Sequence, residues 1–262
     1  MAQDQSPLSD PRNAGSTPFR AGKTKVLPTL APNEIHIWRV GGDARKVNDL
    51  SGFDILAPAE RTRASQFISE ADRAHFIERR AALRMVLAGY LAIAPQDIAF
   101  AVNEFGKPSV LASKASDDLA FNTSHSRGFA LIAVGRSIQI GIDVERLRPG
   151  VELEAIAARF FTANEAGALA ALPSHDRVEG FFNAWTRKEA VVKALGRGLS
   201  IPLDSFEVSL RPREPPAILR WNIPGAPPQS WRIHHIEPAL GYVGAVVVDR
   251  DPSTCRYLTW PI

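Results

Sequence analysis

One segment, SIQIGIDVERLRP, restricts most strongly how this chain can fold, because its apolar side chains recur at every second position. In an extended chain, successive side chains point to opposite faces of a sheet. The spacing therefore predicts a strand with one apolar face, made by Ile138, Ile140, Ile142 and Val144. Asp143 and Glu145 share the opposite face, so the strand presents two carboxylates from one rigid surface. A solvated outer face and a cation site are both compatible with this pattern.

Size and composition define the broad class of the protein. Its 262 residues, 45% of them hydrophobic, suffice for one large domain or two small ones with a substantial core. The longest apolar runs, such as YVGAVVV from Tyr242, are far shorter than the roughly 20 residues of a membrane-spanning helix. We also find no apolar secretion signal before the first expected strand, and Cys255 is the single cysteine. We therefore expect a cytoplasmic protein without membrane contact, disulfide or multi-cysteine zinc site.

The charge balance bears on the possible partners. The 31 basic and 28 acidic side chains leave a formal net charge of +3, which is far from that of a protein that coats nucleic acid. Arginines are concentrated between Arg61 and Arg84, so we expect one local anion-binding face.

The first 33 residues differ in composition from the rest of the chain. Five prolines stand there among serine, glycine, aspartate and lysine, without a sustained hydrophobic period. We expect residues 1–33 to be a disordered tail that contributes nothing to the core. The globular fold then begins with the strand EIHIWRV, from Glu34.

Helical and alternating patterns follow each other along the remainder. SEADRAHFIERRAALRMVLAGYL, residues 69–91, has helical spacing with one apolar face and several arginines around the rest. Strands are expected at 98–102, 119–122, 129–134, 138–144, 206–210, 218–221, 231–236 and 242–248, and further helices at 153–161, 163–172 and 178–195. Helices grouped before antiparallel strands in each half predict an α+β fold of two related lobes.

Two short segments could contact an anionic ligand. In EFGKP, Gly106 permits a tight turn, Lys107 offers a cation and Pro108 fixes the exit, although an ordinary surface turn has the same composition. In FNTSHSRG, hydroxyls and His125 gather where a strand turns, and could donate hydrogen bonds to a phosphate. His125 could equally be a structural hydrogen-bond partner. Because no Gly-x-Ser-x-Gly motif surrounds Ser124, a hydrolase nucleophile is not indicated.

A third segment, FFNAWTRKEAVVKALGRG, is expected to be a helix with polar side chains and a tryptophan on one face. Trp185, Glu189 and Lys193 recur at intervals of four residues. The alternative is a surface ion pair between Glu189 and Lys193, worth a few tenths of a kcal/mol.

Taken together in their order and separations, four motifs resemble the signature set of the Sfp-type 4′-phosphopantetheinyl transferases: FNTSHS, GIDVERLRP, RFFTANE and FNAWTRKEAVVKALGRGLSIPLDSF. EFGKP resembles the nucleotide-side loop of that family, and residues 69–91 its basic helix. The resemblance extends over about residues 34–248. It implies two similar lobes related by a pseudo-twofold axis, with the active site between them. The N-terminal lobe, 34–147, would bind the nucleotide side of coenzyme A. The C-terminal lobe, 148–262, would bind metal and diphosphate together with Asp143 and Glu145.

The resemblance also implies roles for individual residues. It assigns Asp143, Glu145 and Glu189 to Mg²⁺, which suits carboxylate oxygens. Coenzyme A contacts are implied for Arg80, Lys107, Pro108, Ser124, His125 and Lys193, with Arg63 and Arg79 as weaker candidates, and catalytic roles for Glu165, Glu189 and Lys193. Either Glu165 or a metal-bound water would accept the proton of the acceptor serine. Glu165 also suits a capping box with Thr162, and both interpretations stay open.

The implied activity is transfer of the phosphopantetheine arm of coenzyme A to a serine of an apo acyl or peptidyl carrier protein. Adenosine 3′,5′-bisphosphate would be the second product, and we expect a monomer. Two alternatives are a Mg²⁺-dependent phosphohydrolase that uses the same acids, and a nucleic-acid-binding module built on the arginines. The near-balanced charge and the absence of aromatic RNA-binding motifs argue against the module.

Overall fold

The computed structural model describes residues 19, 27–41, 52–111, 118–150, 152–224 and 230–260. Its first sheet has the order β11-β1-β5-β4. The bounds of these strands are β1 (Glu34–Gly41), β4 (Leu119–Ser126), β5 (Phe129–Arg136) and β11 (Thr254–Thr259). β1 pairs antiparallel with β5 and parallel with β11, while β4 and β5 form an antiparallel pair.

The second sheet is antiparallel and has the order β6-β10-β9. Its strands are β6 (Ile140–Arg146), β9 (Arg232–Ile236) and β10 (Tyr242–Val248). Two small two-stranded sheets complete the strands: β2 (Phe100–Val102) with β3 (Pro108–Val110), and β7 (Phe206–Val208) with β8 (Ile218–Trp221). The α+β class is therefore confirmed, whereas β3 and β11 were not expected from the sequence.

Two helices of 22 residues cover the outer faces of the sheets: α2 (Glu70–Leu91) and α5 (Ser174–Leu195). The shorter elements are α1 (Pro58–Ser65), α3 (Leu153–Phe160), α4 (Ala163–Ala170), η3 (Phe53–Ile55), η4 (Pro95–Asp97), η5 (Gly198–Ser200) and η6 (Leu203–Ser205). The Ser69 hydroxyl accepts from the Asp72 amide and caps α2, as the polar residue before a helix often does. No helix within the described ranges is long and apolar enough to cross a membrane.

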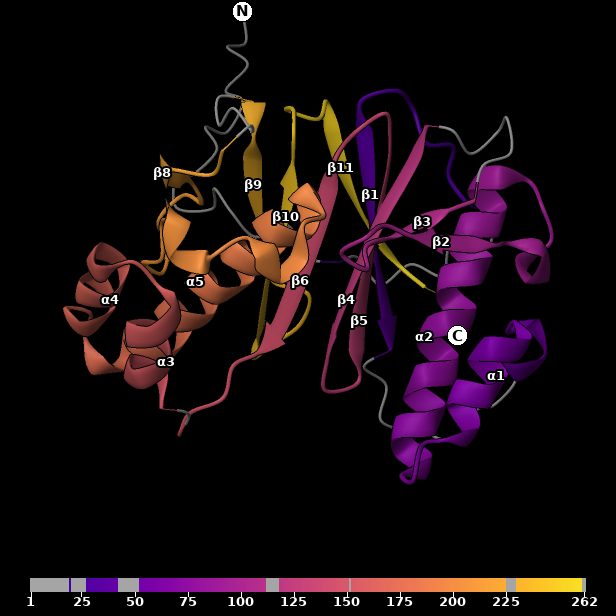
Figure 1. Ribbon diagram of the computed structural model, residues 1–262, viewed down its shortest axis with the longest axis horizontal. Coiled ribbons are helices and arrows are strands. Elements are labelled where there is room, and N and C mark those ends of the chain that lie inside the picture. Colours follow the sequence, from indigo (N-terminus) through magenta and orange to yellow (C-terminus); the bar gives the residue numbers. More distant parts are fainter. Residues whose placement is uncertain are drawn as a thin grey trace, which may run out of the picture.

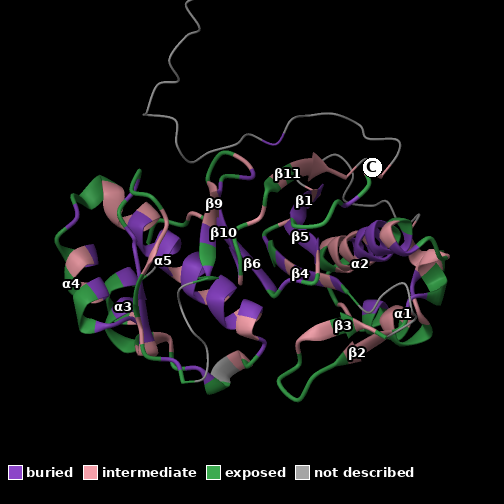
Figure 2. Cartoon of the chain, turned by 90° about the horizontal axis from the view of Figure 1, so that it is seen from above, coloured by how far each residue is buried: buried purple, intermediate pink, exposed green. Residues whose placement is uncertain are grey.

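The layers follow the order helix, sheet, sheet, helix across the molecule (Figures 1 and 2). Between the two sheets lies a core to which β1 contributes Ile35 and Ile37, and β6 contributes Ile140, Ile142 and Val144. The apolar face predicted for residues 138–144 is thus confirmed. Buried residues of α5 pack against β10, and those of α2 pack against the first sheet.

A glycine allows α5 to lie directly against β6. A Cβ atom on Gly141 would stand 2.1 Å from the Ala190 carbonyl oxygen and 2.3 Å from the Ala194 nitrogen. Any side chain at this position would therefore push the helix off the strand. Asp143 and Glu145 leave the same face of β6 as Gly141, so the helix is held close to both carboxylates.

Sequence order and sheet membership differ at two places. β6 precedes residue 147 but pairs with β10, and β11 follows residue 148 but pairs with β1. Each sheet therefore contains strands from both sides of the boundary expected at 147.

The N-terminal segment contributes to the core, which corrects our expectation for residues 1–33. The Phe19 ring is 9% exposed and makes an edge contact with Tyr257, at 5.2 Å between ring centroids. Leu30 is 6% exposed and belongs to the core beneath α2, with Leu27 packed against it. The expectation of disorder for residues 1–18 and 20–26 lies outside the described residues.

We predict that Leu30→Ala lowers the free energy of unfolding by about 2–4 kcal/mol, because removing a buried leucine side chain leaves a cavity. Deleting residues 1–33 should lower the melting temperature at least as much as this substitution. Thermal unfolding monitored by circular dichroism measures both. The matched control is deletion of residues 1–18, which spares Phe19, Leu27 and Leu30 and should have the smaller effect. Equal melting temperatures for the full chain and the 1–33 deletion would contradict the prediction.

Candidate active site

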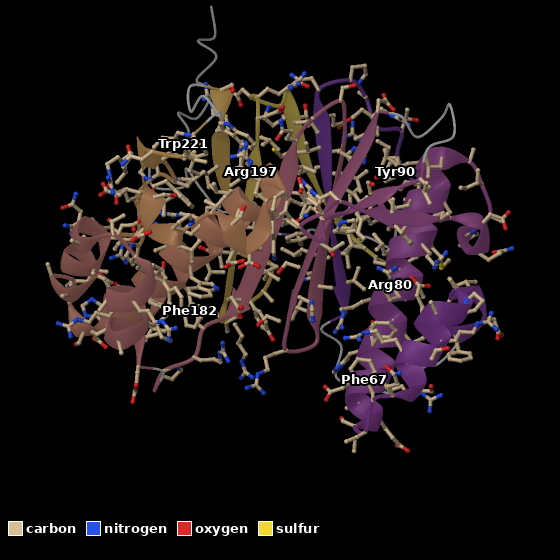
Figure 3. The ribbon with its side chains drawn as sticks, viewed as in Figure 1. Phe67, Arg80, Tyr90, Phe182, Arg197 and Trp221 are labelled. Atoms are coloured by element: carbon tan, nitrogen blue, oxygen red, sulfur yellow. The ribbon has the colours of Figure 1, made fainter. Side chains whose placement is uncertain are left out.

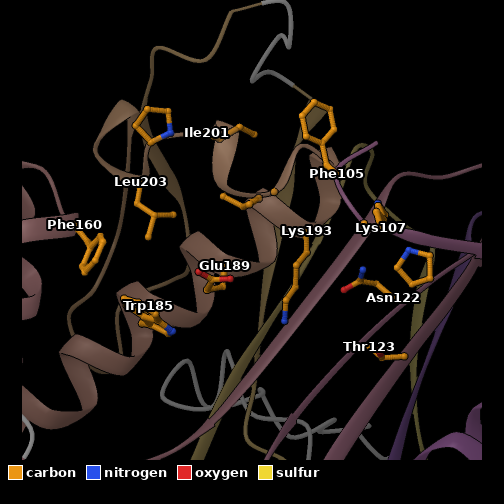
Figure 4. Close-up of a pocket in the computed structure, with 16 residues that line it drawn as sticks. Phe105, Lys107, Asn122, Thr123, Phe160, Trp185, Glu189, Lys193, Ile201 and Leu203 are labelled. Carbon is orange, nitrogen blue, oxygen red and sulfur yellow. The ribbon is translucent and has the colours of Figure 1, made fainter. Parts of the chain in front are cut away.

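A cavity of about 650 Å³ opens between α5 and the first half of the chain. One side is lined by Trp185, Glu189, Val192 and Lys193 of α5, and the other by Asn122 and Thr123 of β4 and by the loop from Phe105 to Pro108. Figure 4 shows Glu189 and Lys193 projecting from α5, with Asn122 and Lys107 across from them. Phe160 and the segment from Ile201 to Leu203 form an apolar wall.

Asp143 and Glu145 are held at the seam where β6 meets β4. The Ser124 hydroxyl donates to Asp143 Oδ1 at 2.7 Å, and the Ser126 hydroxyl donates to Glu145 Oε2 at 2.7 Å. Asp143 is only 5% exposed, so the interpretation of this face as a solvated surface is wrong for that residue.

Lys193 supplies positive charge to this cluster. Its Nζ atom is 2.6 Å from Asp143 Oδ1 and donates to the Ile142 carbonyl oxygen at 3.2 Å. The ion pair suggested by sequence spacing thus forms with Asp143 of β6, and not as a surface pair along the helix. It ties α5 to β6 at the edge of the cavity.

The pKa values of the other two acids, Glu145 and Glu189, are raised. Burial, followed by the charge of Asp143, raises the pKa of Glu189 above its usual value. The pKa of Glu145 is likewise raised by burial and by Asp143, and the bond from Ser126 opposes the rise. The charges of Asp143, Glu145 and Glu189 act on one another, and a nearby cation would relieve this repulsion.

Asp143 offers an atom to such a cation. Its Oδ2 atom is buried and has no hydrogen-bond partner among the described residues. Carboxylate oxygens are the ligands that Mg²⁺ prefers, so the donor set fits that ion chemically. In the described conformation no group of three or more histidine, cysteine, aspartate or glutamate side chains is already arranged to hold a metal.

His125 lies near the end of β4, where its side chain is only partly open to solvent. Loss of hydration, together with the positive charges of Arg79 and Lys193, lowers the pKa of His125 to about 4. Its ring can therefore exchange hydrogen bonds with a ligand, whereas the charge comes from its neighbours. Arg79 thus lies close enough to influence this end of the site, although the sequence favoured Arg80.

Arg80 is engaged away from the cavity. Its Nε atom donates to Glu60 Oε1 at 2.7 Å, and Arg84 Nε donates to Glu60 Oε2 at 2.6 Å. Both guanidinium groups lie over the Phe100 ring. Figure 3 labels Arg80 on α2, beside α1, which carries Glu60. In this structure Arg80 therefore joins α1 to α2, and it is absent from the cavity lining.

Lys107 and Pro108 line the cavity as expected, but the ammonium group has another role as well. Lys107 Nζ donates to the Ala194 carbonyl oxygen at 2.8 Å and to the Ile140 carbonyl oxygen at 3.1 Å. Burial lowers the pKa of Lys107 to about 8. Asn103 supports the same loop, because it donates to the Gly196 carbonyl oxygen at 2.7 Å and accepts from the Lys107 amide at 2.8 Å. The loop is thus docked on the C-terminal end of α5.

Glu165 is buried in a structural network. Its Oε2 atom accepts from the Thr162 amide at 2.9 Å and lies 2.8 Å from Lys188 Nζ, while Oε1 accepts from the Val208 amide at 2.8 Å. The capping box that the sequence left open is confirmed. Lys188 is fully buried and also donates to the Phe206 carbonyl oxygen at 2.7 Å. Both oxygens of Glu165 are therefore committed to folding contacts.

The sequence did not predict that β4 and β6 are joined through side chains: Asn122 and Ser126 were not singled out, and Ser124 was expected only as a coenzyme A contact. The Ile142 amide donates to Asn122 Oδ1 at 3.0 Å, and the amides of Val144 and Arg146 donate to the hydroxyls of Ser124 and Ser126 at 3.2 Å. The alternation N-x-S-x-S in FNTSHS carried this signal, because it places three short polar side chains on one face of a strand.

The fold is of the α+β class, and its cavity is lined by a carboxylate, Glu189, and by two lysines, Lys107 and Lys193. The family model described as the 4′-phosphopantetheinyl transferase superfamily matches residues 139–247, and the model of the N-terminal region of 4′-phosphopantetheinyl transferases matches residues 48–137. The 4′-phosphopantetheinyl transferase HetI from Nostoc sp. is 37% identical over 222 residues, which cover 84% of this chain and 90% of the relative.

Two further relatives span less of the chain. The 4′-phosphopantetheinyl transferase Sfp of Bacillus subtilis is 34% identical over 59% of this chain and 66% of its own length. The human L-aminoadipate-semialdehyde dehydrogenase-phosphopantetheinyl transferase is 30% identical over 60% of this chain and 53% of its own length. The chain therefore belongs to the 4′-phosphopantetheinyl transferase superfamily and is an enzyme of the Sfp type.

We predict that Lys188→Met lowers the free energy of unfolding by about 3–5 kcal/mol, because it leaves the buried Glu165 carboxylate without its counter-charge. Lys193→Met, on the same helix, is the control. The Lys193 side chain is 28% exposed, so its ion pair is partly screened and the expected loss is about 1 kcal/mol. Urea unfolding of the two variants measures the difference. Equal losses would show that the Glu165–Lys188 pair does not stabilise the fold as the contacts indicate.

Proposed function

We propose that this enzyme transfers the 4′-phosphopantetheine arm of coenzyme A to a serine hydroxyl of an apo acyl or peptidyl carrier protein, with adenosine 3′,5′-bisphosphate as the second product. One observation carries the proposal beyond family membership. Glu189 and Lys193 line a cavity of about 650 Å³, Lys193 pairs with Asp143 at 2.6 Å, and the charges of Asp143 and Glu145 act on Glu189. Such a cluster can bind a diphosphate through a cation and an ammonium group together.

Within this proposal, Asp143, Glu145 and Glu189 hold Mg²⁺. Two observations support the assignment: the buried Oδ2 of Asp143 has no hydrogen-bond partner within the described part of the chain, and the pKa values of Glu145 and Glu189 are raised. When bound, the ion neutralises charge on the diphosphate and orients it.

The other side chains orient coenzyme A. Lys193 adds positive charge beside Asp143, and the neutral His125 exchanges hydrogen bonds with the phosphates. Lys107 and Pro108 contact the nucleotide end from the loop docked on α5. Arg79 is a better candidate than Arg80 for a phosphate contact, because Glu60 already occupies Arg80.

The two groups considered for accepting the proton of the attacking serine are Glu165 and a water held by the cation. Glu189 lines the cavity and is already assigned to the cation. Glu165 would first have to break its bonds to Thr162, Val208 and Lys188. We therefore assign Glu165 to the fold and not to proton transfer.

We further propose that the chain forms two similar lobes related by a pseudo-twofold axis, with β11 joined to the first lobe and β6 to the second across the boundary expected at 147. In support, each half contributes one 22-residue helix that covers a sheet, and the cavity lies between them. We also propose a cytoplasmic monomer that acts on carrier proteins, without nucleic acid or membrane as partners. Cys255, the single cysteine, is not among the residues that line the cavity, and burial raises the pKa of its thiol to about 11.

The phosphohydrolase alternative would use the same acids with water as acceptor. It finds no support among the relatives, which are named as transferases.

We predict that this enzyme, incubated with coenzyme A, Mg²⁺ and a panel of apo carrier proteins, adds one phosphopantetheine to a carrier serine. Chelation with EDTA should stop the reaction, and added Mg²⁺ should restore it. Intact-protein mass spectrometry of the carriers measures the transfer. Cleavage of coenzyme A while all carriers stay unmodified would overturn the proposal in favour of hydrolysis.

We predict that Asp143→Asn reduces transfer at least about 100-fold, because it removes one charged oxygen from the proposed ligand set. Asp118→Asn is the matched control, since Asp118 is exposed and pairs with Arg136 at 2.6 Å. Initial rates at saturating coenzyme A measure the effect. Near-normal turnover of Asp143→Asn would remove this residue from the site.

A further inference from the structure

We propose that Ser126, with Ser124, is a positioning residue that fixes the two carboxylates of β6 for a divalent cation. This inference rests on the proposed function and adds to it the residues that orient the ligands. Both serines belong to β4, which lies in the first sheet, whereas Asp143 and Glu145 belong to β6 in the second. The ligand geometry would therefore be set across the seam between the sheets.

Each serine hydroxyl makes the same two bonds. Ser124 Oγ accepts from the Val144 amide at 3.2 Å and donates to Asp143 Oδ1 at 2.7 Å. Ser126 Oγ accepts from the Arg146 amide at 3.2 Å and donates to Glu145 Oε2 at 2.7 Å. Both serines are buried, with exposures of 7% and 8%. The repetition shows one arrangement used twice along the strand.

The chemistry of the partners fixes the direction of each proton. A main-chain amide can only donate, so it occupies a lone pair of the serine oxygen. An ionised carboxylate can only accept, so the hydroxyl proton points at it. Such charge-assisted bonds are shorter and stronger than neutral ones. They hold one oxygen of each carboxylate, and in Asp143 the other oxygen, Oδ2, is left buried and unpartnered among the described residues.

A third residue of β4 provides an internal comparison. Asn122 accepts from the Ile142 amide at 3.0 Å and so forms the same seam contact as the serines. In that register the residue before the amide is Gly141, which has no side chain to receive a proton. Serine therefore occurs at the two positions that face a carboxylate of β6, and asparagine occurs at the position that faces no carboxylate. The hydroxyls therefore serve the carboxylates in addition to the seam.

The test measures metal binding directly on the full chain. Calorimetric titration of Mn²⁺ in the presence of coenzyme A should show about tenfold weaker binding for Ser126→Ala, the usual effect of removing a partner of a metal ligand. Ser126→Thr keeps the hydroxyl and should restore the affinity to within about threefold of the original. Ser65→Ala is the control, because Ser65 is exposed on α1 and its hydroxyl donates only to the Thr62 carbonyl oxygen. Thermal unfolding in EDTA reports the stability of every variant.

The outcomes separate this inference from the proposed function. Weaker Mn²⁺ binding by Ser126→Ala, with rescue by threonine, supports the positioning role. If Ser126→Ala binds Mn²⁺ as tightly as the unmodified enzyme and only its melting temperature is lowered, the positioning role is overturned. Ser126 then serves only to join β4 and β6. If Ser126→Ala does not fold, Ser126→Cys replaces it, because cysteine is close to serine in size but its thiol is a weaker hydrogen-bond donor. Mn²⁺ binding by Ser126→Cys as tight as that of the unmodified enzyme then overturns the inference. Failure of the original enzyme to modify any carrier would count against the proposed function itself.

Discussion

The structure depends on the way in which two sheet edges meet. β4 and β6 end different sheets, and their contact is made by short side chains in place of a main-chain ladder. Asn122, Ser124 and Ser126 accept from three amides of β6, and an unsatisfied buried amide would cost roughly 1–3 kcal/mol. Since two of these side chains also donate to Asp143 and Glu145, the bonds that join the sheets also hold the acids.

The fold holds carboxylates that repel one another at fixed positions in the site. Gly141 allows α5 to approach β6, and this approach brings Glu189 and Lys193 to the acids of the strand. Lys193 compensates Asp143 in part, while the pKa values of Glu145 and Glu189 remain raised. Without the rigid strand and helix, these groups would separate. A proposed cation and an anionic substrate would relieve the conflict together.

The loop from Asn103 to Pro108 lies across the cavity from Glu189 and Lys193 and is bound to the end of α5. Lys107 and Asn103 dock their loop on the carbonyl groups at the end of α5, where the helix dipole favours a cation. On α2, Arg80 and Arg84 are bound to Glu60, whereas the charge of Arg79 lowers the pKa of His125. The proposed substrate contacts are therefore divided between the Lys107 loop, which is fixed to α5, and α2, where Glu60 already binds Arg80 and Arg84.

The sequence by itself determined the α+β class and the apolar face of β6, because hydrophobic periodicity is a local property. Its resemblance to a known family implied the grouping of Asp143, Glu145, Glu189 and Lys193, which stays a prediction. Tertiary structure decided the rest. Glu165 satisfied two patterns in the sequence, and only packing against Lys188 and Val208 assigned it to the capping box. Arg79 and Arg80 are neighbours on one helix, so only the position of Glu60 distinguished them. The return of β11 to β1 and the burial of Leu30 could not be read from local patterns, because both depend on contacts between distant segments.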